Sequence, residues 1–339
     1  MNGQNYESPI DVLWPSLAEA MFSLAPERAA ELRALIARYK VQIRLDRETH
    51  EMKFEGVDLF GGLGLVDVGL RGLERLWAQA FGAVYVYRQA QAVGFARPIN
   101  LRGSEEGNSA CDLMAWALEG EVHGSPASWP EDLPKPQGSP LNEQHKIANE
   151  LFKGAIGFAV LHELGHIVCG HHGTNLSRDM FYRQEFEADE WAYDWLLKNW
   201  REQGNNQQVY IHRATLIASL FALIAISQVY KPRRVWESKH PNTIDRLLRF
   251  LLKHANEDFP FPVGLVWAVP GQILHLHLSQ IQNAVIPPVN GWRTYLHVIR
   301  DAIDQHEQGP VRREFARAGS AGEEGGELSN GDAGGMNHE

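Results

Sequence analysis

The chain has 339 residues, of which 44% are hydrophobic, so it can bury the core of one large domain or of two modest ones. A formal net charge of −10 and the lack of a basic run argue against a nucleic-acid backbone as the main partner. Cys111 and Cys169 are too few for a disulfide framework, and the first residues lack the basic start and apolar run of a signal peptide. We therefore expect a cytoplasmic protein.

The N-terminal part of the chain, residues 1–119, predicts an α+β region. Ala18 to Tyr39 has the periodicity of an amphipathic helix. Val41 to Asp46 and Met52 to Val57 alternate apolar and polar residues, which predicts a small β-hairpin or sheet. Asp67 to Gln91 predicts a long helix from the spacing of its leucine and aromatic residues, although a Val-Tyr-Val-Tyr stretch within it also suits a strand.

Three further regions follow along the chain. Residues 120–140 are rich in proline, which predicts a linker or an ordered loop placed where it could form the wall of a cleft. Residues 141–306 form the expected principal domain, in which helical patterns run from Leu141 to Cys169 and from about Arg178 to Trp200. Residues 307–339 are acidic and rich in glycine, so this tail has little to bury and should be disordered.

The sequence His162-Glu163-Leu-Gly-His166 lies in the first of these two helices. Residues four apart share one face of a helix, so both imidazoles can bind one metal ion while Glu163 faces its open position. The surrounding helix is apolar on nearly every side, which predicts that it is buried. A pair of hydrogen-bonded core histidines would be the alternative, but it leaves the acidic residues of the next helix unexplained.

Those acidic residues are Glu185 and Asp189. A catalytic zinc ion takes three protein ligands and keeps its fourth position for water. A turn and a second helix can bring Glu185 back to the two histidines as the third ligand. Asp189 lies one helical turn further on, so it can hold a ligand imidazole by its other nitrogen. Ala188 is small enough to let the two helices approach, and the sequence therefore predicts a Zn2+ site.

Together with a later His240-Pro241-x-x-x-x-Arg246 segment, these motifs resemble the gluzincin metallopeptidases. The most similar group contains the CaaX prenyl proteases and the HtpX-type quality-control proteases, and the resemblance covers Leu141 to Leu252. It implies a zincin-like core in which Glu185 is the third zinc ligand and the His-Pro segment borders the active site. By the same resemblance, His240 is the best candidate to stabilise the oxyanion.

Two tyrosines of the second helix, Tyr182 and Tyr193, are alternatives for the oxyanion role. Pro241 also suits the first residue of a helix, with Asn242 and Asp245 in a capping pattern, so the His-Pro segment has a purely structural interpretation as well. The motif order and the separate N-terminal region are also similar to the Lit-type phage-exclusion peptidases of bacteria. That resemblance implies an intracellular protease that stays latent until a phage signal, with a host translation factor as its target.

A metzincin site is a competing hypothesis, because His172 stands six residues after His166. The metzincin pattern needs a glycine three residues after the second histidine, where this chain has Cys169, and Gly170 comes one residue late. We therefore expect His171 and His172 to cap the helix C-terminus instead.

Ala214 to Tyr230 is apolar and could cross a membrane, but its 17 residues are at the lower limit of length and include several polar ones. We expect a buried core helix and no membrane partner.

The fold expected from the sequence is α+β and predominantly helical, with the zinc helix and the following acidic helix in a zincin-like core. The expected function is a zinc-dependent endopeptidase acting on an intracellular protein or peptide, in phage exclusion, with Glu163 as the base. The alternatives are a membrane-associated HtpX-like protease and a non-catalytic zinc module that recognises a partner. A structural site has no use for a base beside a ligand, so Glu163 argues against the module.

Overall fold

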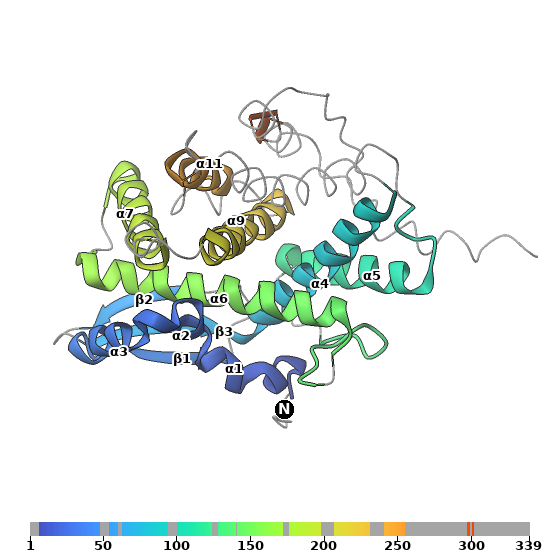
Figure 1. Cartoon of the computed structure of the whole chain (residues 1–339), viewed down its shortest axis with the longest axis horizontal. Helices are drawn as coiled ribbons and strands as arrows, with labels where there is room; N and C mark the ends of the chain where they lie inside the picture. The colour runs from blue at the N-terminus through green and yellow to red at the C-terminus, as the bar shows by residue number, and fades with distance from the viewer. Residues whose placement is uncertain are drawn as a thin grey trace, which may run out of the picture.

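The computed structural model describes residues 7–47, 54–59, 63–93, 100–123, 128–139, 141–171, 176–197, 207–230, 241–254, 297–298 and 300–301. It is predominantly helical with one small sheet, which confirms the predicted fold class. Helix α6 (Glu143–Cys169) runs through the middle of the molecule. The sheet and the N-terminal helices lie on one side of α6, and α7, α9 and α11 lie on the other (Figure 1). The predicted tail at residues 307–339 lies outside the described residues.

Helix α6 forms as predicted, and it begins two residues after the predicted start at Leu141. The side chain of Asn142 accepts a hydrogen bond from the backbone N–H of His145 and so caps the first turn. Gly170 ends the helix with a φ of 69°, a left-handed conformation that glycine adopts without strain. Between these ends the helix is buried along most of its length, because its apolar residues surround it on nearly every side.

The sheet contains β1 (Gln42–Asp46), β2 (Phe54–Leu59) and β3 (Leu63–Gly69) in the order β1-β3-β2. Strand β3 pairs with β1 in parallel and with β2 in antiparallel orientation, so the predicted hairpin of the first two strands is wrong. The reason is that β3 is the most apolar of the three: Val66 and Val68 are buried, which suits a central strand. The first two strands carry charged residues, which suit the edges.

The first helical region is broken rather than continuous, which corrects the prediction of one helix from Ala18 to Tyr39. A 3-10 helix η1 (Pro9–Leu13) leads into α1 (Trp14–Ala18) and α2 (Ala20–Leu24), and after η2 (Pro26–Arg28) comes α3 (Ala29–Arg38). Proline has no N–H and disfavours helical geometry in the residue before it. Ala25 accordingly has φ −138° and ψ 71°, and the chain turns there.

Helix α4 (Leu70–Val93) follows β3 directly and confirms the long helix, including its Val-Tyr-Val-Tyr stretch. Its start is later than predicted, because the residues from Asp67 to Gly69 belong to β3. Helix α5 (Glu105–His123) packs against α4. The Trp77 indole N–H donates to Asn149 of α6 at 2.8 Å, and Asn149 in turn donates to the backbone of Gln137. This asparagine therefore joins α4, α6 and the proline-rich segment.

Three helices cover the other side of α6: α7 (Arg178–Leu197), α9 (Gln207–Tyr230) and α11 (Thr243–His254). Among the described residues, α6 and α9 are long and apolar enough to cross a membrane, and 83% and 67% of their most apolar windows are buried. Such burial is typical of core helices, which is the role predicted for Ala214 to Tyr230. The structure contains no membrane, so the absence of a membrane partner stays a prediction.

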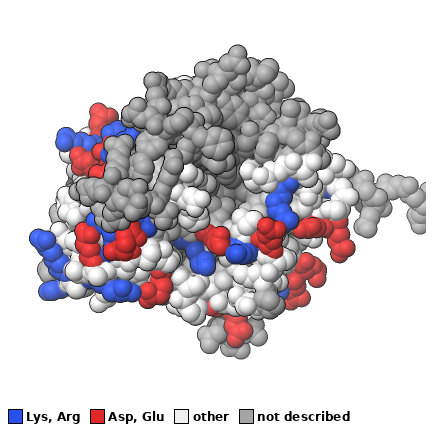
Figure 2. Space-filling model, in the orientation of Figure 1, with Lys and Arg blue, Asp and Glu red and all other residues white. Residues whose placement is uncertain are grey.

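The sequence predicts Pro241 as the first residue of a helix, but helix α11 begins two residues later, at Thr243. The side chain of Asn242 accepts from the backbone N–H of Ile244 at 2.8 Å, so Asn242 is the cap and Pro241 precedes it. On the face shown in Figure 2, basic side chains lie among acidic ones rather than in a single stripe.

Candidate metal centre

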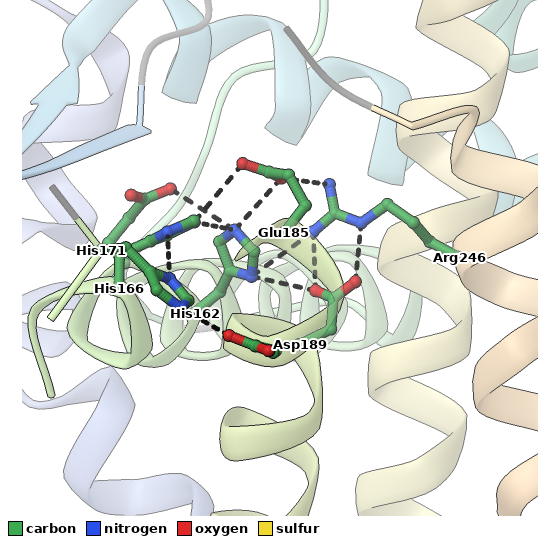
Figure 3. Close-up of polar contacts among 8 residues, drawn as sticks. His162, His166, His171, Glu185, Asp189 and Arg246 are labelled. Atoms are coloured by element: carbon green, nitrogen blue, oxygen red, sulfur yellow. Dashed lines mark hydrogen bonds and ion pairs between the residues drawn. The ribbon is translucent and has the colours of Figure 1, made fainter. Parts of the chain in front are cut away.

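The two motif helices bring three predicted ligands to one point. His162 and His166 project from α6, and Glu185 projects from α7 toward them (Figure 3). The two Nε2 atoms are 3.1 Å apart, and the Glu185 carboxylate oxygens lie 3.5 Å from Nε2 of His162 and 3.4 Å from Nε2 of His166. All three ligand atoms lie within 4.8 Å of one another, so a single metal ion could contact them together.

A close contact between α6 and α7 makes this convergence possible. A Cβ atom added to Gly165 would lie 3.0 Å from the backbone oxygen of Ala188 and 3.2 Å from its Cα. Gly165 is therefore the small residue on α6 that the close approach requires, and Ala188, which the sequence predicts to allow the approach, lies opposite it. Backbone atoms cannot move away as a flexible side chain can, so the two helices would separate if Gly165 were a larger residue.

Glu163 lies beside the ligand cluster and is only 8% exposed. Its Oε1 is 4.0 Å from Nε2 of His162, the nitrogen that faces Glu185. A proton acceptor is thus placed next to the point where the ligand atoms meet, as the motif predicts.

Asp189 holds the other nitrogen of His162. Its Oδ1 lies 2.9 Å from Nδ1 of His162, and the residue is buried at 2% exposure. Burial by itself would lower the pKa of His162, but the charge of Asp189 and hydrogen bonds to Asp189 and Glu185 outweigh it and raise the pKa to about 10. The predicted contact between Asp189 and a ligand imidazole is therefore present in the structure.

Arg246 reaches the site from α11. It belongs to the His-Pro segment of the motifs, but the sequence does not predict a role for it. Its Nε and Nη2 donate to the two carboxylate oxygens of Asp189 at 2.8 and 2.6 Å, and its Nη1 lies 3.4 Å from Glu185. Burial would raise the pKa of Asp189, but the charges of Arg246 and His162 hold it below its usual value. Arg246 thus keeps Asp189 ionised and fixes the direction in which it points.

His171 contacts His166, the second candidate ligand, and the sequence does not predict this contact. Its Nδ1 lies 3.0 Å from Nδ1 of His166, and its Nε2 lies 3.1 Å from Oε2 of Glu187 on α7. Burial lowers the pKa of His171, against the raising effect of Glu187. The backbone N–H of His171 also donates to the carbonyl of His166, so the predicted capping of α6 is made by its main chain.

Of the four remaining predicted residues, the structure describes two and leaves two undescribed. His240 and His172 lie outside the described residues, so the structure does not test the oxyanion role or the metzincin ligand. Tyr193 is buried between aromatic rings of the core, including that of Phe158, where it stacks. The hydroxyl of Tyr182 accepts hydrogen bonds from Arg178.

The charges of the site suit a cation. Glu163, Glu185 and Asp189 are all buried, and the cationic groups that the structure shows against them are the Arg246 guanidinium and the His162 ring, whose pKa is raised. Buried carboxylates are costly unless positive charge compensates them. Two imidazoles and a carboxylate are also the donor set of many catalytic zinc sites. The residues therefore fit a divalent metal such as zinc.

Comparison with known proteins gives two matches. The family model for Peptidase U49 matches residues 66–261, a range that contains the whole cluster. A protein of Escherichia coli (strain K12) named cell death peptidase is 27% identical over 200 residues, which are 57% of this chain and 65% of that protein. No solved structure matches the chain. The matches confirm the resemblance to the Lit-type peptidases that the motifs indicate.

Proposed function

The chain belongs to the Peptidase U49 family, and from this membership and the geometry of the site we propose that it is a zinc-dependent endopeptidase. The proposed substrate is an intracellular protein or peptide, and the proposed location is the cytoplasm. The alignment covers 65% of the similar E. coli protein, so the activity of that whole protein supports the proposal without deciding it.

The observation that carries the proposal is the convergence of His162, His166 and Glu185 with Glu163 beside them. A bound zinc ion would polarise the scissile carbonyl and lower the pKa of water in the position left open by these three ligands. A zinc ion with a purely structural role needs no carboxylate at that position. Glu163 therefore favours catalysis over the alternative of a non-catalytic zinc module.

Glu163 is the proposed general base. Its carboxylate accepts the proton of the attacking water and then returns that proton to the leaving amine. Asp189 keeps the Nδ1 proton of His162 in place, so that Nε2 presents its lone pair to the metal. His240 remains the proposed donor to the oxyanion, on the strength of the family resemblance alone.

Strand β2 is the proposed docking edge for the substrate. It is an outer strand of the described sheet and packs against α6, which carries the two histidines. An extended peptide can add to such an edge through main-chain hydrogen bonds.

We propose phage exclusion as the biological role, supported by the Lit-type resemblance and by the name of the E. coli relative, cell death peptidase. A protease of the cytoplasm must be restrained, so the proposal includes an activating partner. The apolar helix α9 favours one competing function, a membrane-associated quality-control protease, and fractionation of cells distinguishes the two.

Quantitative proteomics of cells that express the wild type or Glu163→Gln tests the proposed function. We expect new protein termini only with the wild type, under conditions that activate the protease, and an equal amount of both chains in the cell. Glu190→Gln is a matched control, because Glu190 is on the same helix as the third ligand but pairs with Arg249 and Lys253. New termini at equal abundance in cells with Glu163→Gln would contradict the proposal.

A further inference from the structure

The two histidines of the candidate metal centre differ in the residues that contact their Nδ1 atoms, the ring nitrogens that face away from the other ligand atoms. Nδ1 of His162 faces Asp189, which Arg246 holds in a buried pair. Nδ1 of His166 faces His171 instead, whose second nitrogen faces Glu187. Figure 3 shows His171 beside His166, on the side of the cluster away from Arg246.

We propose that His171 is a positioning residue for His166, with Glu187 as the final acceptor of the chain of hydrogen bonds. The inference rests on the proposed zinc site and adds to it a specific support for one ligand. The expected result is that zinc affinity depends on His171 although this residue does not touch the metal.

The hydrogen-bond directions follow from the ligand role. When Nε2 of His166 gives its lone pair to a metal, the ring proton must be on Nδ1, which then donates across 3.0 Å to Nδ1 of His171. His171 must therefore be protonated on Nε2, and that N–H points at the Glu187 carboxylate 3.1 Å away. Each hydrogen bond in this series has a single direction. Glu187 therefore selects the tautomer of His171, and His171 selects that of His166.

The same contacts exclude His171 as a fourth ligand. Both of its ring nitrogens are engaged, one with His166 and one with Glu187, so neither faces the point where the ligand atoms meet. His171 therefore does not fill the position that a catalytic site needs for water. The backbone of His171 is fixed as well, because its N–H donates to the carbonyl of His166 at the end of α6.

The residues that contact Nδ1 of His166, directly or through His171, extend to the protein surface, whereas Asp189, which contacts Nδ1 of His162, is buried. The side chain of His171 is 6% exposed, but that of Glu187 is 45% exposed and also accepts from Arg183, which is largely solvent-exposed. Asp189, by contrast, is 2% exposed. Glu187 can thus be changed without opening the core, which makes it the more suitable of the two for experiment.

Zinc affinity should be measured by competition with a chromophoric chelator for the wild type, His171→Ala, His171→Gln and Glu187→Ala. We expect His171→Ala to bind zinc about 10- to 100-fold more weakly, as losses of such outer partners usually do. His171→Gln keeps an acceptor for the Nδ1 proton and should recover part of the affinity. Glu187→Ala should weaken binding in the same direction, whereas Glu190→Ala, its matched control on the same helix, should not.

Two further readouts separate positioning from a structural role. The melting temperature of the metal-free chain should change little in His171→Ala, while the rise on adding zinc should shrink. The visible absorption of the Co2+-substituted protein should also change, because it reports the ligand geometry of the metal.

Zinc affinity in His171→Ala equal to that of the wild type would overturn the inference, as would equal losses in Glu187→Ala and Glu190→Ala. Equal falls in melting temperature with and without zinc would also overturn it. A wild-type chain that binds no zinc would remove the proposed function together with this inference, whereas a zinc-binding wild type with unaffected variants would remove the inference alone.

Discussion

The type of metal site depends on which residue is the third ligand. Glu185 and His172 cannot both complete an open site, because a fourth protein ligand would displace the water. Glu185 faces both histidines at 3.4 to 3.5 Å. We therefore expect Glu185→Ala to lower zinc affinity steeply and His172→Ala to change it little, as measured by metal content after dialysis. Loss of metal only in His172→Ala would show that the family of metal site assigned from the motifs is wrong.

Asp189 provides a graded test at the same scale. Asp189→Asn keeps the shape of the side chain but removes its charge, so His162 is held less firmly and Arg246 keeps only its contact with Glu185 as an ion pair. We expect zinc binding or activity about 10- to 100-fold weaker than in the wild type, between the effects of Glu185→Ala and His172→Ala. A titration of zinc against the purified variants checks this order.

The raised pKa of His162 predicts how the metal-free protein responds to pH. The pKa is about 10 in the fold and about 6.5 in an unfolded chain, so the protonated ring stabilises the fold fully below about pH 6.5. This contribution is lost as the pH rises through about 10. We expect the melting temperature of the metal-free wild type to fall between about pH 7 and pH 10, and to fall less in His162→Asn. The same pH dependence in both proteins would contradict the assignment.

At the scale of elements, the contact between α6 and α7 holds the centre together. Gly165→Ala gains about 1 kcal/mol of helix propensity, but crowding of the Ala188 backbone costs about 1–3 kcal/mol. The net effect should be a weaker zinc site, because Glu185 moves away with α7. Gly154→Ala is the matched control on the same helix, where the added atom meets the end of the flexible Leu216 side chain. Equal zinc affinity in the two variants would count against this account.

The elements also show which features a sequence can predict. The two helices that carry the candidate metal ligands are predictable, because their periodicity is strong and the motif fixes which face carries these residues. The N-terminal helices are not predictable from periodicity alone, because Pro26 interrupts the amphipathic pattern. The sequence pattern does not predict strand β3, because its apolar residues run directly into α4, and the predicted pairing of β1 with β2 is wrong for this reason.

The partners of the metal ligands were predictable only in part. Asp189 lies one turn from Glu185, so helix geometry alone places it at the site. Arg246 lies 57 residues further along the chain than Asp189, and only the packing of α11 brings it there. His171 follows the motif helix closely, but its contact with Nδ1 of His166 depends on the left-handed turn at Gly170.

For the whole molecule, the main question is whether the apolar helix α9 contacts a membrane. Most of the apolar part of α9 is buried against α6 and α11 within the described structure. We therefore expect the full chain to stay in the supernatant after high-speed centrifugation without detergent. Recovery only in the membrane fraction, resistant to salt and carbonate washing, would favour the membrane-associated protease instead.

The central claim is that one metal centre supplies peptide hydrolysis with Glu163 as its base. The most direct test is to measure, in the same purified samples, zinc per chain and cleavage of the substrate found by proteomics. Glu163→Gln should keep nearly as much zinc as the wild type, because the three ligands are intact, and should lose nearly all cleavage. A Glu163→Gln chain that binds zinc and cleaves at a rate comparable to the wild type would contradict the claim.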